Sequence, residues 1–272
     1  MRKYWYFIPF VLISGYLLYT LLKKEPVKLN QARLILSELR GGDFTHAGDK
    51  EAIDMVLGKL KKDFPEALQG NCLDVGCGFG GTANYLMKKG FKCVWGIDID
   101  KSAIEYAKMK YSDVKLFHLD VLSTSKYFDK DFFSFIYLFN VLYAIEDKTT
   151  ALKQLASVSK QGAILMIFDY SVENGIEPIL DLSGKPMRPI CMKTINQQLK
   201  EAGWQVLEIS NISDNFIVWY EQSLKKLEDQ IQKLKGLFLE KDIAKVSSTY
   251  VHLLHHLYRK TLGGVVIYAK RL

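Results

Sequence analysis

The chain has 272 residues, which is long enough for one α/β domain with additions and a sizeable core. Its composition, 49% hydrophobic and 25% charged, is ordinary for a globular protein. The net charge of +7 is moderate and the lysines are scattered over predicted helix faces, which disfavours a nucleic-acid-binding surface. The four cysteines form no C-x-x-C pair, so we expect free thiols in a reducing compartment.

Residues 4–22 form a run of 19 residues without a charge, with a basic pair before it and another after it. Tyr and Trp gather toward its ends, as they do at a membrane interface. A cleaved signal peptide usually has a shorter apolar region and a small-residue cleavage site, and a buried helix usually has a polar stripe. We therefore predict a single-pass membrane anchor over residues 1–24.

Residues 25–49 are predicted to form a linker, a short helix over 31–39 and a polar, glycine-flanked loop over 41–48. An amphipathic helix over 50–62 follows. A loop ahead of the first strand can fold over the ligand site as a lid. His46 in this loop is then a candidate to contact the substrate or the cofactor's carboxylate, and the alternative is a solvent-exposed histidine.

Residues 71–100 read as a buried strand, a glycine-dense turn, an amphipathic helix and a second strand that ends in Asp98. Glycines let the backbone approach a ligand, and the N–H groups at the start of the next helix attract an anion. An acid about 20 residues past the turn can bind the two hydroxyls of a ribose. The ligand is therefore predicted to be a nucleoside that carries an anionic group.

Two cofactors fit this turn. Its glycines satisfy the dinucleotide fingerprint, which is a weak signal alone. Asp74, two residues before the first glycine, suits a ligand with an ammonium group and suits a pyrophosphate poorly, which favours S-adenosylmethionine over NAD. Tyr106 and Lys110 match the Tyr-x-x-x-Lys pair of short-chain dehydrogenases but lie too close to the turn, so we predict that they lie on a helix surface.

The later predicted strands also end in polar residues. The strands over 114–118, 133–139 and 163–168 are followed by Asp120, Asn140 and Asp169. In an open α/β sheet, ligands lie beyond the carboxyl ends of the strands. Asp120 there can accept a hydrogen bond from an adenine amino group, while the backbone N–H of Val121 donates to the ring.

The order of these motifs resembles that of class I S-adenosylmethionine-dependent methyltransferases, from about residue 39 to the C-terminus. The resemblance implies an α/β fold with a Rossmann-like seven-stranded sheet, an antiparallel last strand and a helical insertion before that strand. Residues 50–272 would then form the methyltransferase domain, with a lid-forming insertion over 214–262. The implied cofactor-binding residues are Asp74, Gly76, Gly78, Gly80, Asp98, Ile99, Asp120, Val121 and Asn140.

Within this class, the chain is similar to the phosphoethanolamine and glycine/sarcosine N-methyltransferases. The resemblance implies that Tyr170 and Arg188 hold a substrate phosphate. The sequence departs from the phosphoethanolamine group at Asn140 and Ala144, where that group carries an Asp and a His, and this departure makes phosphoethanolamine itself doubtful as the substrate. Tyr143 can supply a hydroxyl to the site or pack in the core, and with His46 it completes the candidate catalytic residues.

We therefore predict methyl transfer from S-adenosylmethionine to a small polar or lipid-head-group-like acceptor, with an amine as the first choice. O-methylation of a membrane-delivered quinone or phenol and a sensor without turnover are the alternatives. Because this cofactor is used mainly in the cytosol, we expect the catalytic domain to face the cytoplasm. Neither a nucleic-acid partner nor a metal is expected, since the histidines at 252, 255 and 256 lack an acidic neighbour in sequence.

Overall fold

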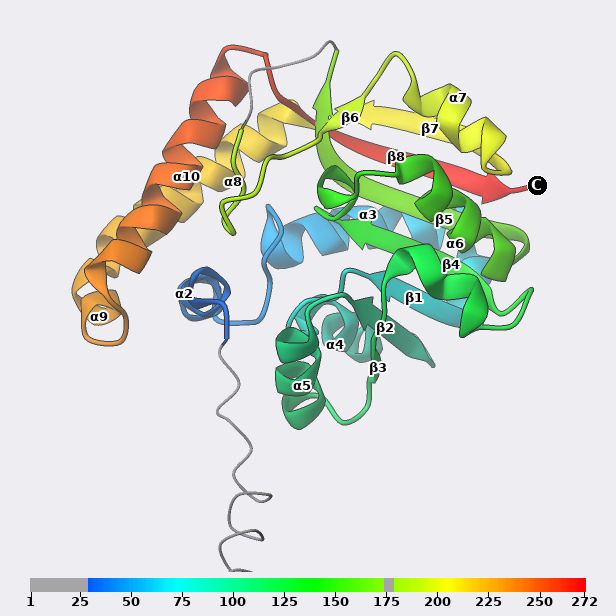
Figure 1. Ribbon diagram of the computed structural model, residues 1–272, viewed down its shortest axis with the longest axis horizontal. Helices are drawn as coiled ribbons and strands as arrows, with labels where there is room; N and C mark the ends of the chain where they lie inside the picture. Colours follow the sequence, from blue (N-terminus) through cyan, green and yellow to red (C-terminus); the bar gives the residue numbers. More distant parts are fainter. Residues whose placement is uncertain (1–28, 174–178) are drawn as a thin grey trace, which may run out of the picture.

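The computed structural model describes residues 29–173 and 179–272. A central β-sheet carries helices on both faces (Figure 1). The strands are β1 Asn71–Val75, β2 Val94–Asp98, β3 Lys115–His118, β4 Phe133–Phe139, β5 Ser159–Val172, β6 Ile190–Cys191, β7 Trp204–Asn211 and β8 Gly263–Arg271. The α-helices are α2 Gln31–Arg40, α3 Asp49–Asp63, α4 Gly81–Lys88, α5 Lys101–Lys110, α6 Lys148–Val158, α7 Ile195–Glu201, α8 Ser213–Asp229, α9 Ile231–Lys235 and α10 Glu240–Tyr258. Short 3₁₀ helices lie at Pro65–Gln69, Val121–Lys126 and Leu142–Ala144.

The strand order is β3-β2-β1-β4-β5-β8-β7, and β6 pairs with β5 outside this path. Strands β1 to β5 are parallel, whereas β8 is antiparallel to both of its neighbours. The chain builds the sheet outward from β1 to β3 and then returns to place β4 on the other side of β1. The carboxyl ends of β1 and β4 therefore form the switch point at which sheets of this kind bind ligands.

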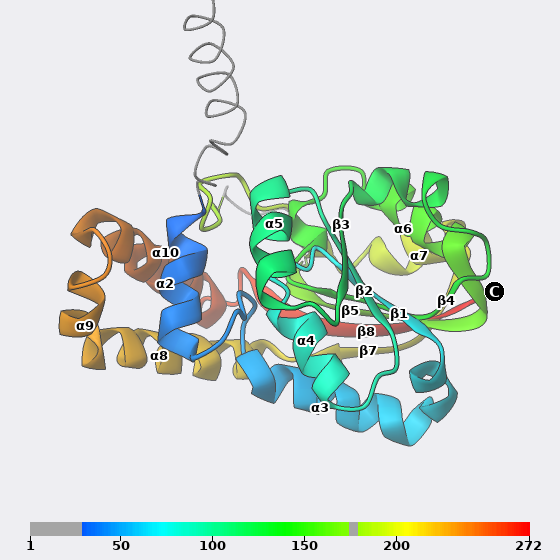
Figure 2. The same ribbon diagram turned by 90° about the horizontal axis from the view of Figure 1, so that it is seen from below.

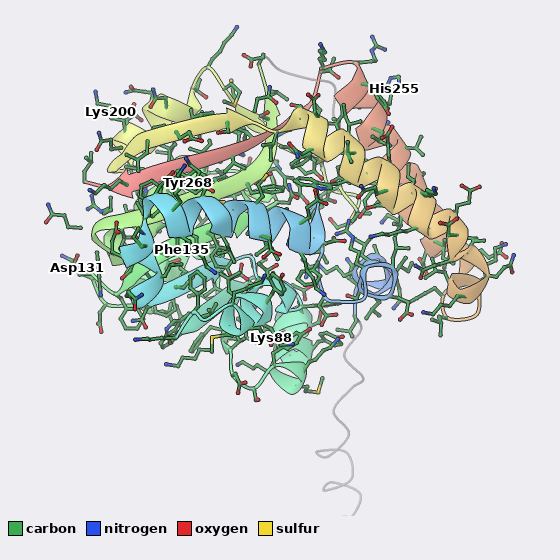
Figure 3. All side chains as sticks on the ribbon, turned by 180° about the vertical axis from the view of Figure 1, so that it is seen from behind. Lys88, Asp131, Phe135, Lys200, His255 and Tyr268 are labelled. Carbon is green, nitrogen blue, oxygen red and sulfur yellow. The ribbon has the colours of Figure 1, made fainter. Side chains whose placement is uncertain are left out.

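The sheet separates two hydrophobic cores because successive side chains of a strand point to opposite faces. In β4, Phe135 and Tyr137 belong to the core shared with α3 and α4, whereas Ile136 and Leu138 belong to the core beneath α6 and α7. Figure 2 shows α3 and α6 on opposite sides of the sheet. In Figure 3, the labelled Phe135 and Tyr268 lie on the face that carries α3, and the Tyr268 hydroxyl donates to the Val56 carbonyl of that helix at 3.3 Å.

Helices α8, α9 and α10 connect β7 to β8 and lie with α2 at one end of the sheet (Figures 1 and 2). Near the end of β5, the Tyr170 ring contacts Phe216 of α8 at a centroid distance of 5.3 Å. These helices therefore cover the carboxyl end of β5 with aromatic side chains. Helix α2 is fixed at its start by Asn30, whose side chain accepts from the N–H of Arg33, and it ends at Gly41 in a left-handed conformation.

The predicted fold class is wrong in two respects. The sheet has eight strands rather than seven, because the two residues of β6 pair with the end of β5 beside the predicted path. The predicted anchor over residues 1–24 lies outside the described residues, and no helix within 29–173 or 179–272 is long and apolar enough to cross a membrane. The α/β sheet with an antiparallel last strand and helices between β7 and β8 is observed.

Two glycine substitutions test how tightly the first helices close on the sheet. A Cβ atom at Gly81 would overlap the backbone carbonyl of Asp43, whereas one at Gly58, in the middle of α3, would meet no atom within 4 Å. We expect Gly58→Ala to raise the free energy of unfolding by about 0.5–1 kcal/mol. We expect Gly81→Ala to lower it by about 1–3 kcal/mol, because the overlap cannot be relieved by rotating a side chain.

Urea denaturation of both variants beside the wild type measures these changes. Equal stability of Gly81→Ala and the wild type would show that the loop at Asp43 does not press on the start of α4.

Candidate active site

The glycine turn after β1 forms a tight cradle at the switch point. Gly76 has a positive φ of 70°, and a Cβ atom there would lie 2.5 Å from a Val141 methyl group in the loop after β4. The N–H groups of Gly76 and Cys77 both donate to the Ile97 carbonyl of β2, at 2.7 and 3.0 Å. The turn is therefore packed closely against the loop after β4 and the carboxyl end of β2.

Two acids flank this cradle. Asp98 is buried, and its carboxylate oxygens accept from the N–H groups of Gly78 and Asp100, each at 2.8 Å. Asp74 is 3% exposed, burial raises its pKa well above the usual value, and Oδ2 has no hydrogen-bond partner within the described part of the chain. An unpaired buried carboxyl oxygen is costly, so a hydrogen-bond donor would relieve it.

At the adenine end of the predicted site, the structure has an exposed apolar side chain and a carboxylate. Ile99, directly after Asp98, is 68% exposed, which is unusual for an isoleucine beside a buried acid. Asp120 accepts from the Leu122 N–H through Oδ1 at 2.9 Å, while Val121 is buried beneath it. The exposed Ile99 and the carboxylates of Asp98 and Asp120 at this edge of the sheet are compatible with the nucleoside of S-adenosylmethionine.

The loop over residues 41–48 is a buried cover rather than a solvent-exposed segment. Arg40, with a side chain only 1% exposed, donates to the carbonyls of Phe44 at 3.2 Å and His46 at 2.5 Å. It also donates to the Tyr250 hydroxyl of α10 at 2.8 Å and pairs with Asp49 at 3.0 Å. Burial alone would lower the Arg40 pKa, but Tyr250 and Asp49 raise it, so the guanidinium stays charged.

The other side of the loop is held by Asp43. Its fully buried carboxylate accepts from the Tyr111 hydroxyl at 2.7 Å and from Lys110 at 2.8 Å. The Tyr106 hydroxyl lies 3.4 Å away, so the Tyr-x-x-x-Lys pair on the surface of α5 also holds the cover to that helix. Because α5 starts three residues after Asp98, the cover and the carboxyl end of β2 are fixed to one another.

His46 lies in the centre of this cover and is 4% exposed. Its ring stacks on Phe139 at 4.6 Å, Nδ1 lies 3.0 Å from the Ala47 carbonyl, and Nε2 lies 3.1 Å from the Thr82 hydroxyl at the start of α4. Burial lowers its pKa to about 3, so the ring is neutral at pH 7. Asn140, with a positive φ of 52°, accepts from the Ala47 N–H at 3.0 Å.

Asn140 Nδ2 is buried and has no hydrogen-bond partner among residues 29–173 and 179–272. This amide donor and the Asp74 oxygen are therefore both buried polar atoms without a partner, at the carboxyl ends of β4 and β1. The predicted cofactor residues thus line the cradle and the carboxyl edge of the sheet, and His46 and Thr82 close it from above.

Tyrosines from three elements pack together near the carboxyl ends of β4 and β5. The ring of Tyr143, after β4, contacts that of Tyr170 at 5.3 Å, and the Tyr170 hydroxyl hydrogen-bonds to that of Tyr220 in α8. Burial raises the pKa of all three hydroxyls, so they remain protonated at neutral pH. Tyr143 therefore both packs against aromatic rings and belongs to the cluster of site hydroxyls.

Asp169 fixes the loop that carries Tyr143. One carboxylate oxygen accepts from the N–H groups of Val141 and Tyr143 at 3.1 and 3.2 Å, and the other accepts from the Tyr170 N–H at 2.7 Å. Burial raises its pKa to about 6, against the lowering effect of these donors. Asp169 thus positions the loop that carries Tyr143 in this tyrosine cluster, and both of its oxygens accept hydrogen bonds.

Arg188 lies at the edge of this tyrosine cluster. Its backbone N–H donates to the Tyr143 carbonyl at 2.9 Å, and its guanidinium lies 3.6 Å from Glu146, with 46% of the side chain exposed. This loose, exposed pair leaves the guanidinium available to an anion.

The histidines of α10 lie elsewhere, and Figure 3 shows His255 at the far end of that helix. Across the described residues, no group of three or more His, Cys, Asp or Glu side chains is arranged to hold a metal.

Sequence reasoning did not identify Arg40, Asp43, Tyr220 or Tyr250. Their partners lie far away in the chain, as in the bond between Arg40 and Tyr250 across 210 positions. One local signal was present, since an Arg in the last helical residue before a glycine can bind the carbonyls of the loop that follows.

Comparison with known proteins gives one family for this fold. A family model described as "Methyltransferase domain" matches residues 49–209. Phosphoethanolamine N-methyltransferase 1 of Zea mays is 27% identical over 62% of this chain, which spans only 35% of that enzyme's length. An O-methyltransferase of Penicillium expansum is 26% identical over 87% of this chain and 88% of its own.

Two solved structures share the fold. Phosphoethanolamine N-methyltransferase 2 of Haemonchus contortus, bound to S-adenosyl-L-methionine, has a TM-score of 0.76 at 17% identity and covers 91% of this chain and 58% of its own. A protein of Galdieria sulphuraria described as a sarcosine dimethylglycine methyltransferase has a TM-score of 0.74 at 17% identity, over 88% of this chain and 98% of its own. At these identities the likeness concerns the fold alone.

The buried, neutral His46 should make stability depend on pH. The unfolded chain takes up a proton at this residue below its ordinary pKa of 6.5, but the folded protein does so only near 3. Stability is therefore lost as the pH falls through this window. Between pH 6.5 and 4.5, we expect wild type to lose about 2 kcal/mol relative to His46→Gln, as measured by urea denaturation.

His255→Gln, at an exposed position of α10, is the control for removing one histidine and should follow the wild-type profile. Parallel pH profiles of wild type and His46→Gln would mean that His46 is not held neutral in the folded protein.

Proposed function

The chain belongs to the methyltransferase domain family and uses S-adenosylmethionine as its cofactor, and from this premise we propose that it methylates the nitrogen of a small polar amine. The observation that carries this proposal is the aromatic cluster of Tyr143, Tyr170 and Phe216, beside a buried His46 that is neutral and a poor proton acceptor. Bound S-adenosylmethionine supplies a methyl carbon on a positively charged sulfur, which an acceptor lone pair displaces in line.

The first support is the state of the ionisable groups. His46 has its pKa lowered to about 3 by burial and faces Ala47 and Thr82, so it is a poor proton acceptor at pH 7. Asp169 is fully buried with both oxygens occupied by backbone N–H groups. An amine that arrives neutral needs no base before it attacks, whereas most hydroxyl acceptors do. The rate then comes mainly from holding the reacting atoms in line.

The second support is the charge that the product carries. When a neutral amine accepts a methyl group, its nitrogen becomes a cation inside the site. The rings of Tyr143, Tyr170 and Phe216 form a continuous aromatic wall, with neighbouring centroids 5.3 Å apart. Aromatic faces attract ammonium groups by about 0.5–2 kcal/mol without the cost of burying a counter-charge. The tyrosine hydroxyls, neutral at this pH, can orient the amine.

Arg188 suits an acceptor that also carries a phosphate or carboxylate. Its guanidinium is exposed beside Tyr143 and only loosely paired with Glu146. A planar guanidinium can bind such an anion through two parallel hydrogen bonds.

A second candidate function is O-methylation. The likeness to the Penicillium expansum O-methyltransferase, which extends over 88% of that protein, favours it. A phenol would need to be acidic enough to ionise in the site, because the groups described above do not offer it a base.

Methyl transfer from labelled S-adenosylmethionine to a panel of acceptors tests the proposal. The purified full-length chain is given ethanolamine, phosphoethanolamine, glycine, a quinol and a simple phenol, and mass spectrometry locates the label on nitrogen or oxygen. We expect transfer to nitrogen and a reduced kcat in Tyr170→Phe. Transfer to oxygen alone would overturn the amine proposal, and cofactor binding without any transfer would support a sensor.

The same panel of acceptors also tests the role of Arg188, because only some of the amines carry an anion. Arg188→Ala should lower kcat/KM about 10- to 100-fold for anion-bearing amines, because charge-assisted hydrogen bonds are lost, and should leave ethanolamine unchanged. Lys185→Ala, an exposed lysine of the same loop, is the matched control. An equal loss on ethanolamine would show that Arg188 supports the wall rather than binding an anion.

A further inference from the structure

The corner of the sheet at β2 and β3 has helices on one face only. Leu116 of β3 belongs to the core shared with α4 and α5, so its neighbours Lys115 and Phe117 point to the opposite face. The segment between β3 and β4, which is described throughout, contains a 3₁₀ helix and no α-helix. Parallel sheets usually have both faces covered, so this corner is more open than usual.

The open face carries a layer of aromatic rings. Phe117 is 40% exposed and stacks on Trp95 of β2, with the ring centroids 5.5 Å apart and the planes 16° from parallel. Phe128 packs edge-on against these two rings, with centroid distances of 6.1 and 5.6 Å. The ammonium of Lys115 lies 4.4 Å from the centroid of the Trp95 ring. The face therefore presents both an exposed ring and a cation of the kind that binds rings.

Strand β3 also has a free edge. It lies at the end of the sheet, and within the described part of the chain it pairs with β2 alone (Figure 1). The Leu119 N–H, just after the strand, donates to the Asp98 carbonyl of β2 at 3.0 Å. Because successive residues of a strand direct their backbone groups to opposite sides, the N–H and C=O groups of Leu116 and His118 point away from β2. These groups are available to another strand.

The other edge strand, β7, is less suited to pairing. Its Leu207 is exposed to almost the same extent as Phe117, at 39%. However, the register of β7 against β8 shifts between Val206 and Glu208, and such bulges protect sheet edges. Strand β3 keeps one regular register against β2. The β3 edge is therefore the better candidate for the addition of a strand.

A second copy of β3 is complementary to this edge. In an antiparallel pair with a two-fold axis at Leu116, the free N–H and C=O groups of the two Leu116 residues bond to one another. Lys115 of each copy then lies directly opposite Phe117 of the other, on the same face. Moving the axis to Lys115 would place two ammonium groups opposite one another, and moving it to Phe117 would remove both cation–ring pairs. Charge and ring position therefore favour one register.

We propose that two copies of this chain associate through β3, antiparallel and two-fold symmetric, with Lys115 of each copy against Phe117 of the other. The exposed Lys108 of α5, whose ammonium lies 5.9 Å from the Phe117 ring, moves aside in this pair. The contact ends at His118, two residues before Asp120, and so lies beside the adenine end of the predicted cofactor site. It depends neither on the acceptor nor on turnover.

Sedimentation velocity of the purified full-length chain across a concentration series tests this interface. We expect the wild type to change from the mass of one chain to that of two as the concentration rises. Phe117→Lys should raise the dissociation constant of the dimer at least about 10-fold, because it places ammonium groups opposite one another. The double variant Lys115→Glu/Phe117→Lys should restore association, since opposite charges then face each other across the axis.

Leu207→Lys is the matched control, because it changes an equally exposed apolar residue on the other edge strand. It should leave the dissociation constant unchanged, and thermal unfolding checks that each variant folds. A wild type with the mass of one chain at every concentration would overturn the proposal, as would an assembly that Phe117→Lys leaves intact or that Leu207→Lys dissociates. If Phe117→Lys does not fold, Lys115→Glu replaces it, because this change at an exposed lysine removes the cation from the ring of the other copy.

Discussion

The buried guanidinium of Arg40 is the interaction on which the rest of the site depends. It connects the end of α2, two carbonyls of the 41–48 loop, Asp49 at the start of α3 and Tyr250 of α10. A charge with a side chain 1% exposed is stable only if its partners are all in place. Elements from both ends of the described chain must therefore assemble together, and the cover over the cradle is formed as part of folding.

This constraint fixes the loop over 41–48 above the carboxyl ends of the strands. Asp43 ties the cover to α5, and His46 ties it to α4 through Thr82. Below it, the carboxyl ends of β1 and β2 supply Asp74 and Asp98. A methyl transfer that relies on alignment benefits from such fixed positions, because little motion has to be frozen out when the reactants bind.

The parts that the sequence predicts well are those that depend on neighbours in the chain. The turn at 76–81 and the strand end at Asp98 follow from glycine spacing and apolar runs, and the observed strand β4 has the predicted bounds. The two-residue strand β6 escapes prediction because it has no periodicity of its own and forms only beside β5. Its pairing is the reason that the sheet has eight strands and not seven.

The candidate site likewise has a part that the sequence predicts and a part that it does not. Its cofactor residues lie at predictable strand ends, but the burial of His46 depends on Arg40, Phe139 and Thr82, which are distant in sequence or unremarkable in it. Tyr220 reaches Tyr170 only because the helices after β7 return over the end of β5. Local sequence patterns do not encode such contacts, so the tyrosine cluster and the loop over 41–48 as a cover are seen only in the structure.

The most direct measurement is a crystal structure of the full-length chain with S-adenosylhomocysteine. We predict that the ribose hydroxyls bind Asp98, that the adenine lies against Ile99 near Asp120, and that the sulfur points toward Tyr143 and Tyr170. A ligand bound outside the carboxyl edge of β1, β2 and β4, or bound there with its ribose away from Asp98, would contradict this assignment of the site.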